Sequence, residues 1–309
     1  MKITDILGFK HNGFEAIEAK HNGIVVWGKV SKQGMFVTLG SSTYGGYSID
    51  GVTWTNYSDL TSTTRNGLAF GKGRFVCVAD RGNSFYSTDG LIWNTMSGLP
   101  AKSFYAVCYG NDRFVAVGAS GSSCYSTDGL TWNEMSGLDS SSNFNGVCYG
   151  NGKFVAVGGN GKIYYSTDGL TWNASATSIG SKACYAVTYG NDRFVMVGEG
   201  ISYYSTDGIS WTSMSGLKSS ITYKGVAYGN GKFVCVGSSY RIYYSTNGTS
   251  WTQVSTTGSN TLNAVTYANG RFVLVGQYIA RYSEDGLTWT SMSDLNNKGT
   301  YYCVCYGEV

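Results

Sequence analysis

The chain has 309 residues, of which 42% are apolar, 15% aromatic and 13% charged, with 44 Gly and 1 Pro. This composition supplies enough apolar surface for a buried core, and it excludes a disordered chain or a collagen-like fibre. The formal charge is only +3 and no run of basic residues occurs, so we expect no binding to nucleic acid.

The N-terminal region lacks the features of a secretory leader. Its first residues, MKITDILGFKHNGFEAIEAK, contain no apolar stretch followed by a cleavage site of small residues. No segment of the chain approaches the ~18 consecutive apolar residues of a membrane span. We therefore expect synthesis in the cytoplasm without a signal peptide, and no membrane insertion.

Residues 1–30 lie outside the repeats and contain three short strand-like runs, ILGF, FEAIEA and GIVVWG. Two His-Asn-Gly turns, which hold His11 and His21, separate these runs. We interpret both histidines as turn residues, although a pair of histidines is also able to contribute to a metal site in a symmetric oligomer. Because a three-stranded meander of this size is marginal alone, the segment is predicted to dock on the rest of the chain or on another subunit.

Residues 31–309 repeat one pattern, Tyr-Ser-x-Asp-Gly-x-x-Trp, in seven copies whose tryptophans lie 38 to 40 residues apart. A period near 40 residues is typical of solenoids and propellers. Each unit divides into four short β-prone runs separated by Gly, Asn and Asp, without a helical period. The sequence therefore predicts an all-β fold, a seven-bladed β-propeller of four-stranded antiparallel blades.

The two ends of the repeat region complement each other. The C-terminal YYCVCYGEV is a first strand without a following blade, whereas MFVTLG at the start is a second strand without a first strand. Residues 301–307 are therefore expected to supply the inner strand of the blade formed by residues 35–57. This pairing closes the ring and removes open sheet edges.

The repeated box, as in YSTDGLTW at 125–132, resembles the Asp-box (BNR-type) repeats of sialidases and of several non-enzymatic propellers. The box suits a structural role, in which its Asp accepts backbone N–H bonds and its Trp packs between neighbouring sheets. Asn247 replaces the Asp in one copy and is able to make the same bonds. The predicted structural residues are Asp50, Asp89, Asp128, Asp168, Asp207, Asn247, Asp285, Trp54, Trp93, Trp132, Trp172, Trp211, Trp251 and Trp289.

The resemblance also raises the question of sialidase activity. Sialidases of this repeat family use three arginines, a tyrosine and an acid, and they are usually six-bladed. In this chain the residue after the first turn of a blade is either Arg or Lys, as in Arg113 and Lys153. Such a mixture is typical of a solvated hairpin edge rather than of a clamp for a substrate carboxylate.

The carboxylates give no sign of a catalytic pair. A glycosidase needs two carboxylates within roughly 5–10 Å of each other, and each box turn carries one carboxylate, too few for a Ca²⁺ loop. We therefore predict no catalytic residue, no metal site and no cofactor. The few acidic residues outside the boxes include Asp80, Glu134, Glu199 and Glu284, and these four lie on different blades.

The cysteines follow the repeat. Cys108, Cys148 and Cys305 occupy one first-strand position at which other blades have Ala or Thr, and Cys303 stands where other blades have Ala or Gly. These positions need small side chains. We therefore interpret the cysteines as reduced, packed thiols rather than as metal ligands or a redox pair.

Comparison of the blades with one another separates two faces of the predicted disc. Connections between strands one and two and between strands three and four are nearly invariant, whereas the other connections vary and share the opposite face. Variable loops carry function more often than invariant ones, so we expect the ligand on that face. Its single aromatic and cationic residues include Tyr44, Arg81, Lys162, Tyr240, Arg241 and Tyr278.

A further variable position lies two residues before the first-strand Val or Leu. Because the first strand is innermost in a propeller, these residues are expected to ring the mouth of the central channel as a ligand-binding rim. The alternative is that they only begin the strand and pack against neighbouring blades. The residues are Asn66, Tyr105, Asn145, Tyr185, Lys224, Asn263 and Tyr302.

A polar surface with single aromatic side chains suits neutral ligands such as glycans. We therefore expect a non-catalytic binding protein that recognises a cell-surface polysaccharide or glycan through the variable face. Two alternatives stay open: a sialidase-like glycoside hydrolase acting on the same face, and a protein-binding assembly or scaffolding propeller.

The sequence HNGIVVWG at 21–28 resembles the short Asn-Gly-x-x-Val-Trp endings of many bacteriophage tail and baseplate proteins. This resemblance implies a lectin-like, receptor-binding adhesin of a phage tail or a tail-like particle, incorporated into the virion. Residues 1–30 would then contact other tail or baseplate subunits.

Overall fold

The structure is a computed structural model that describes residues 6–11, 14–21, 24–29, 32–292, 294–295 and 299–309. The chain forms two compact units, Met1–Gln33 and Gly34–Gly307. Within the described residues, no helix is long and apolar enough to cross a membrane.

The first unit is a three-stranded antiparallel sheet of β1 (Ile6–His11), β2 (Phe14–His21) and β3 (Ile24–Lys29), in the order β1-β2-β3. These strands cover the three runs predicted from the sequence. His11 and His21 are the last residues of β1 and β2. The Asn-Gly residues that follow each of them lie outside the described residues.

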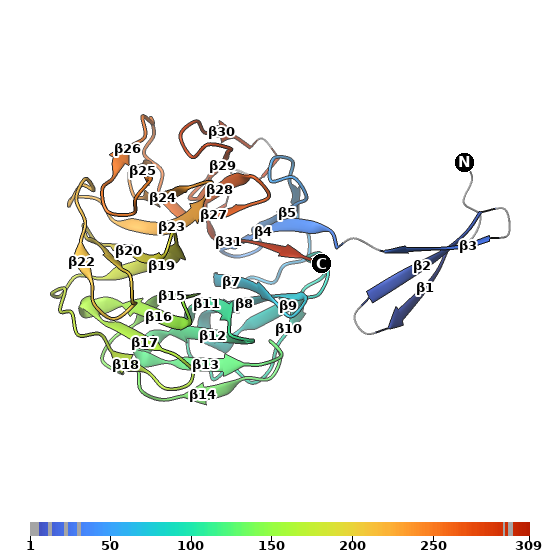
Figure 1. Cartoon of the computed structure of the whole chain (residues 1–309), viewed down its shortest axis with the longest axis horizontal. Helices are drawn as coiled ribbons and strands as arrows, with labels where there is room; N and C mark the ends of the chain where they lie inside the picture. The colour runs from blue at the N-terminus through green and yellow to red at the C-terminus, as the bar shows by residue number, and fades with distance from the viewer. Residues whose placement is uncertain (1–5, 12–13, 22–23, 30–31, 293, 296–298) are drawn as a thin grey trace. The chain divides into compact units, whose positions relative to one another are not determined.

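The second unit is a propeller of seven four-stranded sheets, arranged as a ring in Figure 1. The innermost strands are β7 (Arg65–Gly71), β11 (Phe104–Gly110), β15 (Phe144–Gly150), β19 (Cys184–Gly190), β23 (Tyr223–Gly229), β27 (Leu262–Ala268) and β31 (Tyr301–Glu308). The second strands are β8 (Arg74–Ala79), β12 (Arg113–Gly118), β16 (Lys153–Gly158), β20 (Arg193–Gly198), β24 (Lys232–Gly237), β28 (Arg271–Gly276) and β4 (Gly34–Gly40).

The outer half of each blade is shorter. The third strands are β9 (Ser84–Ser87), β13 (Ser123–Ser126), β17 (Ile163–Ser166), β21 (Ser202–Ser205), β25 (Arg241–Ser245), β29 (Ile279–Ser283) and β5 (Gly45–Ser48). The outermost strands are β10 (Asn94–Thr95), β14 (Asn133–Met135), β18 (Asn173–Ala174), β22 (Thr212–Ser213), β26 (Thr252–Gln253), β30 (Thr290–Ser291) and β6 (Thr55–Asn56). In three blades a 3₁₀ turn joins the second and third strands: η1 (Asp80–Gly82), η2 (Ala119–Gly121) and η3 (Gly159–Gly161). The predicted fold class is confirmed.

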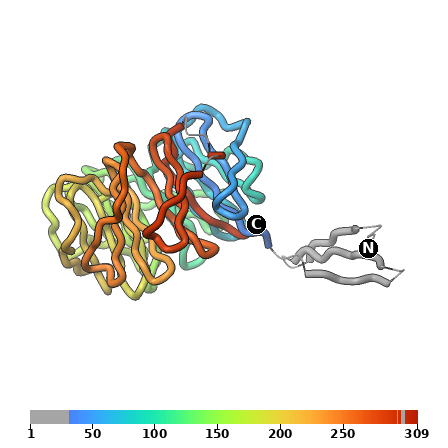
Figure 2. Tube along the Cα trace, turned by 90° about the horizontal axis from the view of Figure 1, so that it is seen from above, coloured from blue at the N-terminus to red at the C-terminus, as the bar shows by residue number. Residues whose placement is uncertain are grey.

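The ring closes through the chain ends. The C-terminal strand β31 is the inner strand of the sheet β31-β4-β5-β6, so the red end of the chain lies beside the blue start of the propeller in Figures 1 and 2. The Thr38 hydroxyl of β4 donates a hydrogen bond of 2.9 Å to the Cys303 carbonyl of β31. The prediction that the last strand completes the first blade is confirmed.

A buried arginine stands beside this closure. Arg65 begins β7, is only 1% exposed, and takes the place that Phe104 has in the next blade. Its guanidinium donates to the carbonyl oxygens of Ser42 at 2.7 Å, Thr61 at 2.8 Å and Thr63 at 3.1 Å. The side chain thereby ties the closing blade to the loop that leads into β7.

The second strands are buried on both faces because each blade packs between two neighbours. In β12, Phe114 and Val115 are both fully buried. Phe114 packs in a cluster with Val76 of the preceding blade, whereas Val115 packs with Phe144 of the following blade. This geometry explains why these strands are continuously apolar rather than alternating.

An aromatic residue followed by glycine, at or near the end of six of the seven inner strands, fits one blade to the next; β27 ends in Tyr267-Ala268 instead. A Cβ placed on Gly110 would lie 2.2 Å from Cγ of Tyr149 in the following blade, and Gly150 has the same relation to Tyr189. The aromatic ring of one blade therefore lies flat on the glycine of the preceding blade, and a larger residue would push the ring away.

The box turn is a hydrogen-bonded unit. Asp128 Oδ1 accepts bonds of 2.8 Å from the amides of Leu130 and Thr131 and of 2.9 Å from the Ser126 hydroxyl, which itself accepts 2.7 Å from the Gly129 amide. Partial burial works to raise the pKa of Asp128, but these donors outweigh it and lower the pKa to about 2. Asn247 accepts the corresponding amide bonds at 2.9 and 3.1 Å.

The box tryptophans lie between blades. Trp132 is 6% exposed and packs in one cluster with Phe114 of its own blade and with Val76 and Val78 of the preceding blade. The ring centroids of Trp132 and Phe114 are 6.5 Å apart. The described geometry therefore gives the box Asp and Trp side chains turn and packing roles.

Candidate functional site

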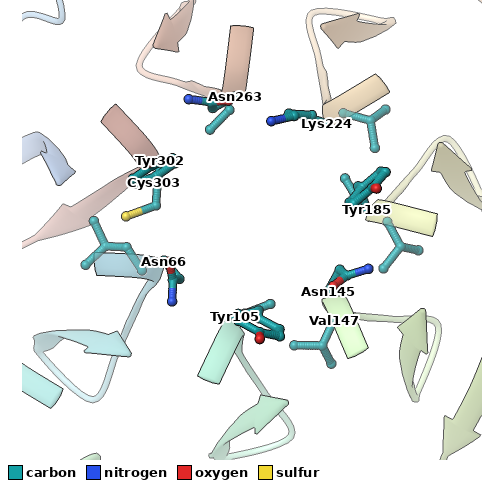
Figure 3. Close-up of a pocket in the computed structure, with 18 of the residues that line it drawn as sticks. Asn66, Tyr105, Asn145, Val147, Tyr185, Lys224, Asn263, Tyr302 and Cys303 are labelled. Carbon is teal, nitrogen blue, oxygen red and sulfur yellow. The ribbon is translucent and has the colours of Figure 1, made fainter. Parts of the chain in front are cut away.

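The structure brings the seven predicted rim residues together around one end of the central channel (Figure 3). Each blade supplies one residue, and together they line a cavity of about 320 Å³. Six of the side chains are half-buried, and Asn263 is buried at 9% exposure. The seven residues are Asn66, Tyr105, Asn145, Tyr185, Lys224, Asn263 and Tyr302.

A β-bulge places these side chains in the channel. In the pairing of β11 with β12, Phe104 lies opposite Gly118 and Ala106 lies opposite Val117, so Tyr105 is the extra residue. The same register shift surrounds the rim residue in β7, β15, β19, β23 and β27. A bulge bends the strand and re-aims one side chain. The rim is therefore a built feature of the inner strands rather than a frayed strand end.

The channel also presents aliphatic side chains. A volume of about 190 Å³ is lined by the seven rim residues together with one Val or Leu side chain from each blade. Val107 and Val147 belong to this ring and are 7% and 8% exposed. The site thus combines a polar rim with a ring of aliphatic side chains.

The three rim asparagines hold neighbouring blades together. Asn145 Nδ2 donates 2.8 Å to the Cys184 carbonyl of the next blade. Asn66 and Asn263 make the same kind of bond, of 3.0 and 2.9 Å, to the carbonyls that precede Tyr105 and Tyr302. The structural alternative considered from the sequence therefore describes these three residues.

The other rim side chains point at the cavity without partners. In the part of the chain that the structure describes, no hydrogen bond or ion pair engages Tyr105, Tyr185, Tyr302 or Lys224. Burial, and after it the charge of Glu199, raise the pKa of Tyr185. Its phenol is therefore protonated at neutral pH and able to donate a hydrogen bond.

Two carboxylates stand just outside the mouth. Asp80 directly follows β8 and accepts a 2.9 Å bond from Asn66. Glu199 directly follows β20, so the two acids occupy equivalent positions in their blades. The residues that line the channel cavity include no Asp or Glu. The proximity of Asp80 and Glu199 to the mouth was not predicted from the sequence. It is seen only in the contact of Asp80 with Asn66 and in the effect of the Glu199 charge on Tyr185.

The six variable-loop residues do not join the rim in lining the channel cavity. Tyr240 is 3% exposed and packs in the core between two blades, with the Arg281 guanidinium 5.3 Å from its ring centroid. The ring of Tyr44 packs against Gly299, where an added Cβ would lie 2.2 Å from the Tyr44 Cγ. These two tyrosines are thus held by the fold, and Arg241, the next residue after Tyr240, is half-buried.

The remaining loop residues are more accessible. Lys162 forms a 2.7 Å ion pair with Asp139. Arg81 is exposed, Tyr278 is 51% exposed, and both have a positive φ, of 59° and 56°. Tyr278 is therefore the loop aromatic most available to a ligand.

The repeated basic position lies at the opposite end of the inner hairpin from the rim. The Arg113 guanidinium is 5.9 Å from the ring centroid of Tyr125 in its own blade. Arg113 also lies against Gly169 in the box turn of the next blade. A Cβ added to Gly169 would be 3.0 Å from the Arg113 Cδ. Such side chains brace the box turns and do not line the channel cavity.

The thiols are packed in the fold, five of them buried and Cys108, Cys148 and Cys305 half-buried. All eight cysteines are free, and burial raises the pKa of Cys77 and Cys305 to about 12. Among the described residues, no three His, Cys, Asp or Glu side chains are grouped so that they could hold a metal ion.

Known proteins share the fold of this chain. No protein-family model and no curated protein matches its sequence. Among solved structures, YCF48 bound to D1 peptide is 16% identical, with a TM-score of 0.60, covering 87% of this chain and 94% of its own. A catalytically inactive virginiamycin B lyase from Staphylococcus aureus with quinupristin is 14% identical, with a TM-score of 0.69, covering 79% and 88%. A nidogen/laminin complex is 11% identical, with a TM-score of 0.55, covering 88% and 98%.

At these identities the similarity shows the fold alone. The similar structures include a peptide-bound protein, a lyase and a protein complex, so the fold does not select one activity. The chain is a seven-bladed β-propeller, and inner-strand bulges in six of its blades help to present a ring of side chains at one end of its channel.

Proposed function

We propose that this protein is a non-catalytic binding protein that recognises a glycan at the channel mouth. The observation that carries the proposal is the convergence of unpartnered side chains from four blades, those of Tyr105, Tyr185, Lys224 and Tyr302, on one cavity of about 320 Å³. Because no carboxylate lines this cavity, it favours binding over acid–base hydrolysis.

The chemistry of the mouth matches that of a sugar. A sugar ring has an apolar face and a rim of hydroxyls, and a tyrosine offers an apolar face together with a hydroxyl that donates and accepts. Lys224 adds a donor for ring or hydroxyl oxygens. A volume near 320 Å³ lies at the low end of the roughly 300–1,000 Å³ typical of small-ligand sites, which suits one end of a glycan chain.

The mouth is also preorganised. The amides of Asn66, Asn145 and Asn263 are bonded to the neighbouring blades, and the bulges set the direction of the rim side chains. Binding therefore orders few additional groups, which reduces its entropic cost.

We extend the proposal to the setting of the protein, as a receptor-binding adhesin of a phage tail or tail-like particle whose ligand is a cell-surface polysaccharide. Residues 1–30 would attach the propeller to other tail or baseplate subunits. The support is the HNGIVVWG sequence together with a small sheet that forms a unit of its own.

The test is retention of polysaccharides from a panel of cell-surface glycans on the immobilised chain, with released sugars measured in parallel. We expect one or more glycans to be retained uncleaved. Replacement of Tyr105, Tyr185 or Tyr302 by Ala should weaken retention about 10-fold each, because each removes a stacking face. The matched control is Tyr278→Ala, which removes an exposed tyrosine outside the cavity.

Three results would redirect the proposal. Release of sugars would support the hydrolase alternative. Loss of binding in Tyr278→Ala but not in the rim variants would move the site to the loops. A rim that binds a polypeptide and no glycan would support the protein-binding alternative, for which the peptide-bound structure of YCF48 is the precedent in this fold.

A further inference from the structure

A second cavity lies at the junction between the blade of β19–β22 and the blade of β23–β26. Its volume of about 440 Å³ exceeds that of the channel mouth. The polar side chains that line it come from the loop before β19, from the connection that follows β20, and from the loop between β22 and β23. They are Ser181, Lys182, Glu199, Ser219, Ser220 and Thr222.

The walls of this cavity are fixed to each other by the backbone. The Gly200 amide donates 2.9 Å to the Ile221 carbonyl, and Glu199 pairs with Thr222 as an antiparallel bridge. Gly200 has φ of +64°, and a Cβ on it would lie 2.0 Å from the Ser219 carbonyl oxygen. Only glycine allows the two loops to approach this closely. The cavity is therefore a defined part of the fold.

The cavity adjoins the channel mouth. Thr222 precedes Lys224 by two residues, and Lys182 precedes Tyr185 by three. At about 3.3 Å per residue in extended chain, these steps correspond to roughly 7 and 10 Å. Tyr185 and Lys224 are neighbours on the rim in Figure 3, and the charge of Glu199 reaches Tyr185.

The side chains of the cavity form a set that binds polyols. The Glu199 carboxylate accepts two hydrogen bonds from vicinal hydroxyls, and the Lys182 ammonium donates to hydroxyl oxygens. Four serine and threonine hydroxyls are able both to donate and to accept hydrogen bonds. An apolar ligand finds little to bury against here, because Ile221 is the only aliphatic side chain among the lining residues. A dianionic phosphate is disfavoured by the charge of Glu199.

We propose that this cavity is a second glycan subsite beside the channel mouth, so that a linear oligosaccharide extends from Tyr185 and Lys224 outward across the blade junction. The inference rests on the proposed function and deepens it. One end of the glycan occupies the mouth, and a later sugar places vicinal hydroxyls against Glu199 and Lys182. The ligand is therefore an oligosaccharide rather than a single sugar.

The test is calorimetric titration of the full chain with malto-, cello-, chito- and galacto-oligosaccharides of one to six units. We expect affinity to rise with chain length until the junction is filled and then to level off. Glu199→Gln, which loses hydrogen bonds to a charged group, and the pair Ser219→Ala with Ser220→Ala, which loses two hydroxyl partners, should each weaken the binding of long oligosaccharides roughly 10-fold or more. Both should leave the binding of the shortest unchanged. Ser140→Ala, in the loop between the blades of β11–β14 and β15–β18, is the matched control.

The outcomes separate this inference from the proposed function. If the junction variants bind every length like the wild type while Tyr185→Ala loses binding, the second subsite is wrong and the channel mouth stands. If the wild type binds no oligosaccharide and retains no glycan from the panel, both are overturned. Unchanged circular dichroism of Glu199→Gln shows that its fold is intact, as expected for an exposed side chain.

Discussion

Replacing the box carboxylate Asp128 tests the physical account of the repeated turn. In Asp128→Ala, the amides of Leu130 and Thr131 and the Ser126 hydroxyl lose their shared acceptor. Each such bond contributes about 0.5–1.5 kcal/mol net, and water replaces part of it at this exposed turn. We therefore expect a loss of about 2 kcal/mol in the free energy of unfolding, comparable with the loss of a helix N-cap.

The amide variant separates hydrogen bonding from charge. Asp128→Asn keeps an acceptor oxygen, as Asn247 does naturally with amide bonds of 2.9 and 3.1 Å. Asp128→Asn loses only the extra strength that the negative charge gives to these hydrogen bonds. We expect this loss to lower the free energy of unfolding by about 0.5–1 kcal/mol, because the side chain is exposed and solvent screens its charge. The reciprocal change, Asn247→Asp, should stabilise the protein by a similar amount.

The pH dependence has a definite sign. The pKa of Asp128 is about 2 in the folded chain against 3.8 for a free carboxyl. A lowered folded pKa stabilises the protein above the unfolded pKa, and this contribution is lost as the pH falls through the folded pKa. The advantage of the wild type over Asp128→Asn should therefore be complete above about pH 4 and disappear near pH 2.

Urea denaturation followed by tryptophan fluorescence measures these differences as shifts of the midpoint at constant slope. The reasoning is refuted if Asp128→Asn costs as much as Asp128→Ala at pH 7. It is also refuted if the difference between wild type and Asp128→Asn is the same at pH 5 and pH 2.

Two further predictions concern the core. Arg65→Leu leaves three loop carbonyls beside the ring closure without their donor. We expect it to lower the free energy of unfolding by about 3 kcal/mol, measured by urea denaturation. An unchanged denaturation midpoint would show that the guanidinium contributes nothing to the stability of the closed ring. Cys77, Cys235 and Cys303 are buried with raised thiol pKa, so iodoacetamide at pH 8 should not label them in the native chain but should label all 8 cysteines after unfolding. Rapid native labelling of any of the three, detected by peptide mass spectrometry, would contradict the packing seen here.

The blade architecture was predictable because its determinants are local and repeated. Each copy carries its own turn chemistry, such as the Ser126 and Asp128 bonds, and its own apolar second strand. Closure of the ring followed from the unmatched strands at residues 35–57 and 301–307. These features need no information about contacts between distant residues.

The position of the rim residues was predictable from the sequence, but the way the rim is built was not. The blade alignment located Tyr105 and its six equivalents. The register shift found at six of these positions depends on pairing with the second strand and leaves no pattern in residue type. Asn145 read as a binding residue, and only the nearby Cys184 carbonyl shows that it bridges two blades. Tyr240 was predicted as a loop residue available to a ligand, but it packs in the core between two blades, with the Arg281 guanidinium beside its ring.

Arg65 illustrates the same limit. A charged residue at the start of a strand reads as exposed, because a buried guanidinium is costly without partners. Its partners are carbonyls of two loops, those of Ser42, Thr61 and Thr63. Their proximity to Arg65 follows from the closed ring and not from the spacing of residues along the chain.

A crystal structure of the full chain with a glycan that the panel retains tests the central claim most directly. The account predicts a sugar ring in the channel mouth, in contact with at least one of Tyr105, Tyr185 and Tyr302 and within hydrogen-bonding distance of Lys224. A glycan bound at the box turns or on the outer strands, with none in the channel mouth, would contradict it.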